Sequence, residues 1–488
     1  MQAGAIAVVL AASLHRAFEL DRFLVPKELV LHVTAVLAGL CALRILRTLV
    51  LTWIDILLFA WLVLGVLSVV TAQNRWVGVR ALAVCASSAV VFWVARSLRE
   101  AGLARPLLYA IAAAIVVAAI TSLVQAYGVR LDLFAIDRAP GGTLGNRNFI
   151  GHAMAFGLPV LLFAALQSAR WIPGVPVVLA ALVLTRSRAA WIACAASMLV
   201  FVVAIVMRGD GRTWRRVAMI ALFAGGGVAA ALLVPNALRW RSDNPYLESV
   251  TSVARYDEGS GRGRLVQYEQ SLRMSAQFPL LGVGPGNWPV AYPAHAARHD
   301  PSLNESEPGT TFNPWPSSDW VAFVAEHGFA AAMLMLLVFA GLAFSPAEDW
   351  LARATLLGTL VAAGVAGAFD AVLLLGAPSL LVWSAIGALC VPSTTSERRV
   401  VLVAIVAIVI SAIGMVRSAS QLVAMEMYAK NTSLQLASRI DPANYRLRLR
   451  LARGGNRKER CGHARAAHAL FPNAEAARAA ARGCGKNK

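Results

Sequence analysis

Two pairs of arginines stand beside apolar segments at separate places in the sequence, and their side chains suit phosphate chemistry. Arg186 and Arg188 occur in TRSRAAWIA, between two apolar segments, and Arg262 and Arg264 occur in GSGRGRLVQYEQSLRM, ahead of an amphipathic segment. The planar guanidinium group binds phosphate through paired hydrogen bonds. An arginine at the edge of a membrane span is a functional hypothesis by default, and the alternative is a side chain that merely extends to the interface.

Amides and carboxylates begin two further apolar segments. Asn146 and Asn148 precede the apolar run in GTLGNRNFIGHAMAFGLPV, where they could bind a polar head group or, for Asn148, cap the following helix. In PSSDWVAFVAEHGF the ionisable residues are Asp319, Glu326 and His327. Asp319 and Glu326 are seven residues apart, which is two turns along one helix face.

A glycine-proline turn over 282–287 has the form GxGxGN and ends in Asn287. A dinucleotide-binding loop of this form follows a β-strand and opens the helix of a βαβ unit. No such strand precedes the turn, so the sequence argues against a dinucleotide site. Asn287 remains a candidate for binding a substrate.

The composition is that of a helical membrane protein. Of the 488 residues, 58% are hydrophobic and 15% are charged, and the mean hydropathy is +0.63, whereas soluble domains contain about 25% charged residues. These values exclude an ordinary soluble enzyme, a disordered chain and a disulfide-dense secreted scaffold. They predict an all-α polytopic membrane protein. The six cysteines have no metal-binding spacing.

A membrane-spanning helix needs about 20 apolar residues, and thirteen segments approach this length. His15 and Arg16 end the first segment, and Pro173 and Pro176 shorten the seventh, so 12–13 transmembrane helices are expected. The segments lie near 3–20, 28–46, 52–72, 79–96, 105–126, 149–169, 171–185, 189–207, 216–234, 320–343, 354–374, 376–392 and 400–416.

The distribution of Lys and Arg orients these spans, because cytoplasmic loops carry the excess of positive charge. Three clusters fall on one side, which is therefore predicted to be cytoplasmic: Arg96–Arg99–Arg105, Arg208–Arg212–Arg215–Arg216 and Arg398–Arg399. The polar gap at 235–318 and the C-terminal tail then lie outside. Five arginines fall on that outer side against the rule, which makes them candidates for function: Arg130, Arg138, Arg147, Arg186 and Arg188.

The chain is thus predicted to have four parts. Residues 1–234 form an N-terminal bundle of about nine spans, 235–318 a large periplasmic loop, 319–417 the C-terminal spans, and 418–488 a basic helical tail. From Lys430 to Lys488 the tail has fourteen Lys and Arg against three acidic residues, a net +11 of the chain's +19. It lacks interleaved aromatic residues for nucleic acid, so an anionic membrane surface or acidic glycan fits better.

The loop 235–318 is rich in aromatic residues, which could stack on sugars or form a small core of their own. These residues are Trp240, Tyr246, Tyr256, Tyr268, Trp288, Tyr292 and Trp315.

The tail phrase DPANYRLRLRLA resembles a tetratricopeptide (TPR) unit, but only one or two units fit and these would have to pack on a partner. A docking, glycan-guiding or capping role stays open. In an oxidising compartment, Cys461 and Cys484 could form a disulfide.

The phrases around Asn146, Arg188, Arg264 and Asp319, in this order, resemble the O-antigen ligase/polymerase family of membrane glycosyltransferases. The resemblance covers roughly 141–390 and includes FDAVLLLGAP around Asp370. It implies a multi-pass GT-C-type enzyme of the bacterial inner membrane that takes a glycan from an undecaprenyl-diphosphate carrier on the periplasmic face. The implied acceptor is lipid A–core, a growing glycan or another molecule, and membrane lipids surround the protein. No metal or other cofactor and no nucleic acid is implied.

The resemblance also implies roles for particular residues. Arg188 matches the family's "SR" arginine, and Arg264 matches the arginine before its amphipathic helix. Fixed guanidinium groups in a poorly hydrated site stabilise a departing diphosphate without a metal. The residues expected to bind substrate are Asn146, Asn148, Arg186, Arg262, Tyr268, Asn287 and Asp370.

One position departs from the family. Its usual histidine lies eleven residues before the glycine that is Gly328 here, and this sequence has Ser317 at that place. Asp319, two residues on, is the expected general base, with a structural acid at a helix N-terminus as the alternative. His327 is a second catalytic candidate, but it lies about 15 Å deeper and could be a packed helix histidine.

The sequence does not separate ligase from polymerase, although the tail and the absent histidine favour work on exported polysaccharide (exopolysaccharide) over lipopolysaccharide ligation. Two other classes stay open: a transporter that flips the lipid-linked glycan, and an inactive scaffold for polysaccharide assembly. Transporters often show internal repeats and charges near the membrane midplane. This sequence shows no repeated half, and its arginines lie at the outer edge.

Overall fold

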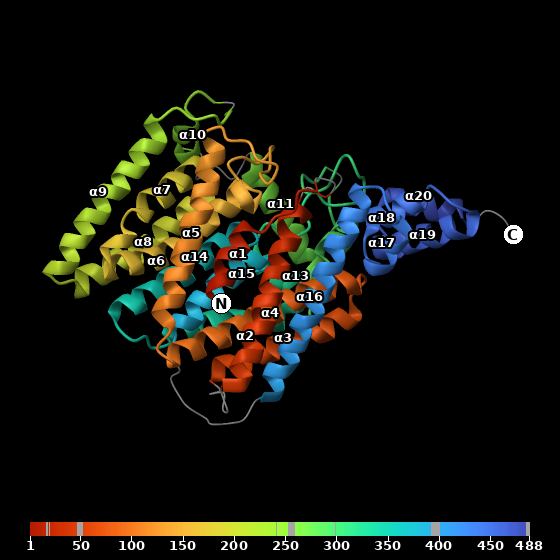
Figure 1. The fold of residues 1–488 in the computed structure, drawn as a ribbon. Helices are drawn as coiled ribbons and strands as arrows, with labels where there is room; N and C mark the ends of the chain where they lie inside the picture. Colours follow the sequence, from red (N-terminus) through yellow and green to blue (C-terminus); the bar gives the residue numbers. More distant parts are fainter. Residues whose placement is uncertain are drawn as a thin grey trace.

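The structure is a computed structural model that describes residues 1–15, 18, 20–45, 52–240, 242–251, 259–297, 299–391 and 401–484 (Figure 1). The predictions that concern Arg16, Tyr256, Arg398–Arg399 and 485–488 fall outside these residues. Within the described ranges there is no β-strand, and one isolated bridge joins Leu303 to Thr311.

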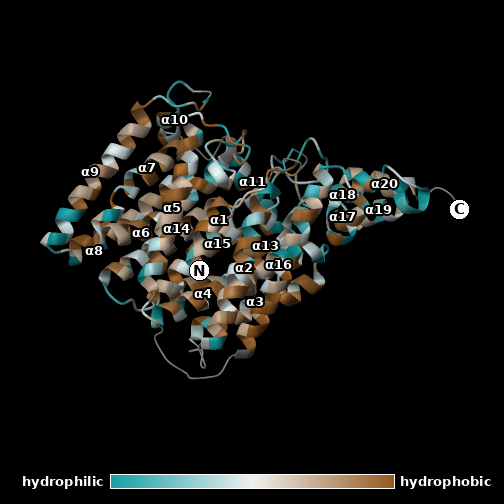
Figure 2. Ribbon diagram, in the orientation of Figure 1, coloured by the Kyte–Doolittle hydropathy of each residue, from teal (hydrophilic) through white to brown (hydrophobic). Residues whose placement is uncertain are grey.

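Ten helices of the described chain are long and apolar enough to cross a membrane. They are α2 (Asp21–Ile45), α3 (Trp53–Thr71), α4 (Arg75–Glu100), α5 (Ala104–Ala126), α6 (Arg147–Gln167), α8 (Arg188–Arg208), α9 (Gly211–Leu233), α13 (Asp319–Phe344), α14 (Trp350–Phe369) and α16 (Val401–Ala429). Two shorter apolar helices, α7 (Gly174–Thr185) and α15 (Gly376–Leu389), pack among them. Hydrophobic residues dominate this bundle (Figure 2). The prediction of an all-α polytopic membrane protein is confirmed.

The first predicted span is an exception. Among the described residues of this stretch, only α1 (Gln2–Leu10) is helical, and its nine residues rise roughly 14 Å. The chain leaves the helix at Ala11, and α2 begins at Asp21. The prediction of one spanning helix over 3–20 is therefore wrong, because the polar stretch after Ala11 ends the helix within half a membrane thickness.

Polar caps mark where several spanning helices begin. Asn74, Asn146, Asp210, Ser318 and Asp349 each accept a hydrogen bond through the side chain from a backbone N–H two or three residues further on. Such caps satisfy amides that have no partner within the helix. They place the start of α6, α13 and α14 at defined residues.

The connections between helices lie on two opposite sides of the bundle (Figure 1). One side, called the loop side below, carries the segments 127–146 and 370–375, the large loop and the tail. The α4–α5 and α8–α9 connections lie on the other side, with the arginines of 96–105 and 208–216. In the described residues the large loop and the tail thus lie on one side of the bundle, opposite these two basic clusters, and the assignment of that side to the periplasm stays a prediction.

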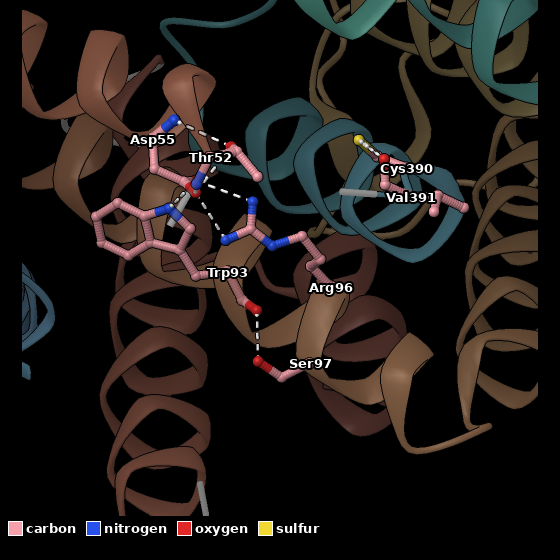
Figure 3. Close-up of polar contacts among 7 residues, drawn as sticks. All are labelled: Thr52, Asp55, Trp93, Arg96, Ser97, Cys390 and Val391. Atoms are coloured by element: carbon pink, nitrogen blue, oxygen red, sulfur yellow. Dashed lines mark hydrogen bonds and ion pairs between the residues drawn. The ribbon is translucent and has the colours of Figure 1, made fainter. Parts of the chain in front are cut away.

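Arginine on the side opposite the loop also holds helices together (Figure 3). Arg96 of α4 forms a buried two-pronged ion pair with Asp55 of α3, with N–O distances of 3.0 and 2.9 Å. The indole N–H of Trp93 donates to the same carboxylate at 2.9 Å, and Thr52 caps α3. Removing one partner of such a buried pair is strongly destabilising, so part of this basic charge serves packing.

Helix α13 is interrupted at Gly328, where φ is 85° and ψ is 169°. The loop segment 279–288 fills the interruption, and the backbone N–H of Val283 donates to the carbonyl of Ala325 at 2.9 Å. A Cβ on Gly328 would lie 2.3 Å from the carbonyl oxygen of Leu280. The interruption therefore anchors the large loop in the membrane bundle.

The described part of the loop has little regular structure apart from three short elements and one longer helix. These are α10 (Pro245–Thr251), α11 (Gly259–Gln277), α12 (Trp288–Ala291) and η3 (Tyr292–Ala294), and two other 3-10 turns, η1 (Gly142–Leu144) and η2 (Ala169–Trp171), flank α6. Helix α11 packs against α13. The predicted amphipathic helix is therefore present and packs on the bundle, but it begins at Gly259, so Arg262 and Arg264 lie within it and not ahead of it.

The tail begins later than predicted. Helix α16 continues to Ala429 without a break at 417, so the predicted boundary is wrong; the apolar spacing in SASQLVAMEMYA keeps the helix intact. Four helices follow: α17 (Leu434–Ile440), α18 (Tyr445–Leu451), α19 (Arg457–Leu470) and α20 (Glu475–Gly483). The TPR-like character of this tail stays a prediction.

The tail packs on the large loop. The backbone N–H of Glu475 donates to the carbonyl of Pro308 at 2.9 Å, and the Asn473 amide donates to the carbonyl of Val290 at 2.9 Å. Cys461 and Cys484 form the disulfide that the sequence allows, with a Cα–Cα distance of 5.5 Å. The disulfide joins α19 to the end of α20.

Candidate active site

The first turn of α6 brings two of the predicted polar residues together. The side-chain oxygen of Asn146 accepts from the N–H of Asn148 at 3.0 Å, so Asn146, and not Asn148, caps the helix. This leaves the Asn148 amide free to approach Asp370 at the end of α14, with Nδ2 and Oδ2 3.5 Å apart. Asp370 is half-buried. An amide donor and a carboxylate thus meet at the loop-side end of the bundle.

Aromatic rings of the loop contact three arginines at the same end of the bundle. The guanidinium groups of Arg147 and Arg186 lie 5.0 and 4.8 Å from the ring centroid of Trp240. Arg138 lies 5.5 Å from the ring of Phe312 and acts electrostatically on Arg147. Cations over aromatic faces are attracted by the ring quadrupole. The rings therefore offset part of the electrostatic repulsion between these neighbouring arginines.

Arg186 links this group to the loop helix α10. It ends α7 in the left-handed conformation, with φ 53°. Its Nε donates to the Ser249 hydroxyl at 2.9 Å, and its Nη2 pairs with Glu248 at 3.1 Å. Arg186 is half-buried. These contacts attach α10, near the start of the large loop, to the end of α7.

Arg188 opens α8 directly beside α6. It is the first residue of α8 and is half-buried. A Cβ on Gly151 of α6 would lie 3.0 Å from the Cβ of Ser187 and 2.9 Å from that of Ala190. The absence of a side chain on Gly151 therefore lets the start of α8 approach within one helix turn of Asn148. The positive end of the α8 dipole adds to the charge there.

Arg264 approaches the same place from α11. It is half-buried and, with Asp370, is a charged group that acts electrostatically on the imidazole of His152, one turn below Asn148 on α6. Tyr268, one turn further along α11, has its hydroxyl 2.5 Å from the Ser317 carbonyl and 2.9 Å from the Ala368 carbonyl. A phenol has one proton, so it can donate to one of the two carbonyls at a time.

Position 317, where the resemblance implies a histidine, therefore lies beside Asp370. The backbone N–H of Ser317 donates to the Gln267 side chain at 2.6 Å, and its carbonyl shares the Tyr268 hydroxyl with the end of α14. Ser317 thus stands at the site, although a serine hydroxyl is no base at neutral pH.

Asp319 is placed as a structural acid. It is fully buried at the start of α13, and its carboxylate accepts from the backbone N–H groups of Val372 (3.0 and 3.1 Å) and Leu373 (2.9 Å). Those residues follow Asp370 directly. The geometry favours the alternative to a base role, because the carboxylate is saturated by amides and holds the turn that carries Asp370.

The other two ionisable groups of α13 also lie in the core. Glu326 accepts from the N–H groups of Gly286 (2.8 Å) and Trp288 (3.1 Å), which ties the glycine-proline turn to the break in α13. His327 is 1% exposed and stacks on Trp61 with ring centroids 5.1 Å apart. The surroundings of His327 favour the packed-histidine interpretation over catalysis.

Two predicted binding residues are not brought to the arginines. Asn287 is fully buried, and its amide exchanges hydrogen bonds with the backbone of Asn74 at 2.8 and 3.1 Å, so it joins the loop to the α3–α4 turn. Arg262 is exposed on α11, two residues from Arg264 and therefore on a different face of the helix.

The aromatic residues of the loop divide between the two predicted uses. Trp288 and Tyr292 are fully buried, and with Met274 and Ala325 they form a small core under the loop. Trp240 and Trp315 are half-buried at the α6 end, where Trp315 lies 6.1 Å from Phe149 between ring centroids. Trp240 contacts the two arginines, which leaves Trp315 as the candidate for stacking on a sugar.

Sequence reasoning missed His152 and gave Arg147 and Trp240 no specific task. His152 lies in the quoted phrase GNRNFIGHA, four residues after Asn148, and this spacing puts both on one helix face. That spacing was the available signal. The contact of Arg147 and Arg186 through one ring of the loop has no counterpart in sequence spacing.

The arrangement suits an anion. Five arginines, called the arginine cluster below, surround the loop-side end of α6: Arg138, Arg147, Arg186, Arg188 and Arg264. Across the described ranges, no three His, Cys, Asp or Glu side chains come together as a metal-binding group. Guanidinium groups fixed by rings and helix ends can stabilise charge that develops on a phosphate without having to reorganise.

Comparison with known proteins is consistent with this geometry. Residues 174–336 match the sequence model of a family described as O-antigen ligase. The match begins in α7 and ends in α13, so it contains Arg186, Arg188, Arg264 and Asp319. No curated protein matches the chain. The chain is a polytopic helical membrane protein in which residues 174–336 match the O-antigen ligase family.

Proposed function

We propose that this protein transfers a glycan from an undecaprenyl-diphosphate carrier to an acceptor at the loop side of the bundle, which we take to be the periplasmic face of the bacterial inner membrane. The observation that carries the proposal is the arginine cluster at the loop-side end of α6, beside the Asn148–Asp370 contact. A diphosphate at the membrane surface has the charge and the position that this cluster suits.

The mechanism follows from where charge develops. The bond between the sugar and the diphosphate breaks as the acceptor oxygen attacks, and negative charge grows on the departing diphosphate. We assign the stabilisation of this negative charge to Arg188 and Arg264. Arg147 and Arg186 add further positive charge at the site. Because these groups are held before the reaction, their stabilisation needs no metal ion.

Asp319 enters the proposal as a positioning residue. Its carboxylate holds the backbone of Val372 and Leu373, and this turn presents Asp370 to Asn148. Loss of Asp319 would therefore displace Asp370 without removing any group that touches the substrate. Lipid A–core, a growing glycan or another exported polysaccharide remains the proposed acceptor.

Complementation of a deletion strain tests the proposal. Arg188→Ala and Arg264→Ala should each abolish glycan transfer while the protein still accumulates in the membrane. Arg212→Ala is the matched control, since Arg212 is an exposed arginine at the start of α9 on the opposite side. Surface glycans separated by gel electrophoresis report the result, and full transfer by either site variant would refute the arginine assignment.

The same strain distinguishes the remaining activities. Loss of glycan length with the anchor retained indicates a polymerase, and loss of the anchored glycan indicates a ligase. Lipid-linked glycan retained on the cytoplasmic face indicates a transporter and contradicts the transferase proposal.

A further inference from the structure

His152 is a buried histidine without a hydrogen-bond partner at the proposed site. It lies one turn below Asn148 on α6 and is 2% exposed. Neither Nδ1 nor Nε2 of its ring has a partner. Buried polar atoms in proteins are almost always hydrogen-bonded, so a ring with two unpaired nitrogens calls for partners that form only when substrate is bound.

The charged groups near His152 indicate the kind of reaction to which its ring is suited. The charged groups that act on its ring are Asp370, from the turn after α14, and Arg264, from α11. At its neighbour Gly151, helix α8 contributes Ser187 and Ala190, and Thr185 closes α7, all without charge at neutral pH. The ring of His152 is therefore within electrostatic range of a carboxylate and of one arginine of the cluster.

A second buried histidine, His32, differs from His152 in its hydrogen bonds. His32 of α2 is fully buried as well, but its Nδ1 lies 2.8 Å from the hydroxyl of Ser87. His32 is thus partly satisfied by the protein itself. His152 combines burial, two unpaired nitrogens and a place beside the proposed reacting groups.

We infer that His152 and Asp370 form the base of the transfer reaction, an inference that rests on the proposed function. The Asp370 carboxylate accepts one ring N–H and so fixes the tautomer, and the other ring nitrogen faces the acceptor hydroxyl. Such hydrogen bonds are often long in a protein without substrate and close in the complex. The pairing follows the logic by which a carboxylate orients a catalytic histidine.

The step balances as follows. The acceptor hydroxyl gives its proton to the free nitrogen of His152, and the acceptor oxygen forms the new glycosidic bond to the sugar carbon. The bond from that carbon to the diphosphate oxygen breaks, and its electron pair leaves with the diphosphate beside Arg188 and Arg264. The imidazolium that remains is paired with Asp370 and later gives its proton to water.

The test compares His152→Gln and His152→Asn with the control His32→Gln. Each protein is reconstituted with membranes of the deletion strain, which hold donor and acceptor, and the transfer rate is measured from pH 5 to 9. Binding of undecaprenyl diphosphate to the same preparations is measured in parallel and reports whether each variant is folded.

We expect both His152 variants to bind undecaprenyl diphosphate like the wild type and to transfer about 10²–10⁴-fold more slowly. We also expect the wild-type rate to fall toward acidic pH and this fall to be absent from both His152 variants. His32→Gln should keep the wild-type profile. A His152 variant that binds and keeps both the rate and the pH profile overturns the inference, whereas transfer that survives Arg188→Ala and Arg264→Ala overturns the proposed function instead.

Discussion

At the scale of residues, two arginines of the site contact the same aromatic ring. Arg147 and Arg186 come from α6 and the end of α7, and both guanidinium groups lie within 5.0 Å of the centroid of Trp240. Each contact of this kind contributes about 0.5–2 kcal/mol, depending on exposure. Trp240 therefore offsets part of the repulsion between the two cations and keeps them ready for an anion.

Replacement of Trp240 tests this arrangement. Trp240→Ala should weaken the binding of undecaprenyl diphosphate about tenfold, because both arginines lose the ring that fixes them. Trp214→Ala is the control, since Trp214 is an exposed tryptophan of α9 on the opposite side. Unchanged binding by Trp240→Ala in lipid nanodiscs would mean that the ring does not organise the cluster.

The sequence supports some of these residues better than others. Arg188 and Arg264 were predictable because they flank apolar segments and match a family phrase. The environments of Asp319 and Asn287 were not, because the sequence does not show that the backbone N–H groups of Val372 and Leu373 and the backbone of Asn74 meet their side chains. Such contacts join segments 53 to 213 residues apart.

At the scale of elements, the break in α13 connects the loop to the bundle. Glu326 binds the turn at 286–288, and Gly328 lets the chain leave the helix where Leu280 approaches. The sequence predicted one span over 320–343, although Glu326, His327 and Gly328 interrupt its apolar pattern at the break. What ends the helix is a positive φ that glycine adopts without strain.

Gly328→Ala tests the break. The new Cβ would lie 2.3 Å from the Leu280 carbonyl at a φ of 85°, and strain of this kind costs about 1–3 kcal/mol. The melting temperature of the purified protein should fall, and loop 279–288 should become accessible to protease. Gly225→Ala, in open space on α9, should melt like the wild type. Equal melting of the two variants would contradict the account.

At the scale of the whole molecule, the tail and the large loop are in contact on the loop side, and the tail projects away from the bundle (Figure 1). The sequence predicted their shared side from the charge distribution and the number of spans, although α1 is too short to be one of those spans. It could not predict that the tail packs on the loop, since the contacts include hydrogen bonds to the backbone carbonyls of Pro308 and Val290. Composition and periodicity thus determine the fold class, whereas docking depends on individual turns.

The contact between tail and loop is open to a direct test. A Cβ on Gly309 would lie 2.0 Å from the carbonyl oxygen of Asn473, at a φ of 79°. Gly309→Ala should therefore release the tail, and the Glu475 amide, which donates to Pro308, should exchange its hydrogen faster. Gly454→Ala, with no atom within 4 Å of the new Cβ, should exchange like the wild type. Protection that persists in Gly309→Ala would show that the tail is held by other contacts.

The central claim is that guanidinium groups from separate helices hold one diphosphate at the loop side. The most direct measurement is the affinity of the protein in lipid nanodiscs for undecaprenyl diphosphate relative to undecaprenyl monophosphate. The wild type should prefer the diphosphate, and Arg188→Ala and Arg264→Ala should each lose that preference while Arg212→Ala keeps it. Equal affinity of the wild type for both lipids, or a preference that survives both arginine substitutions, would contradict the claim.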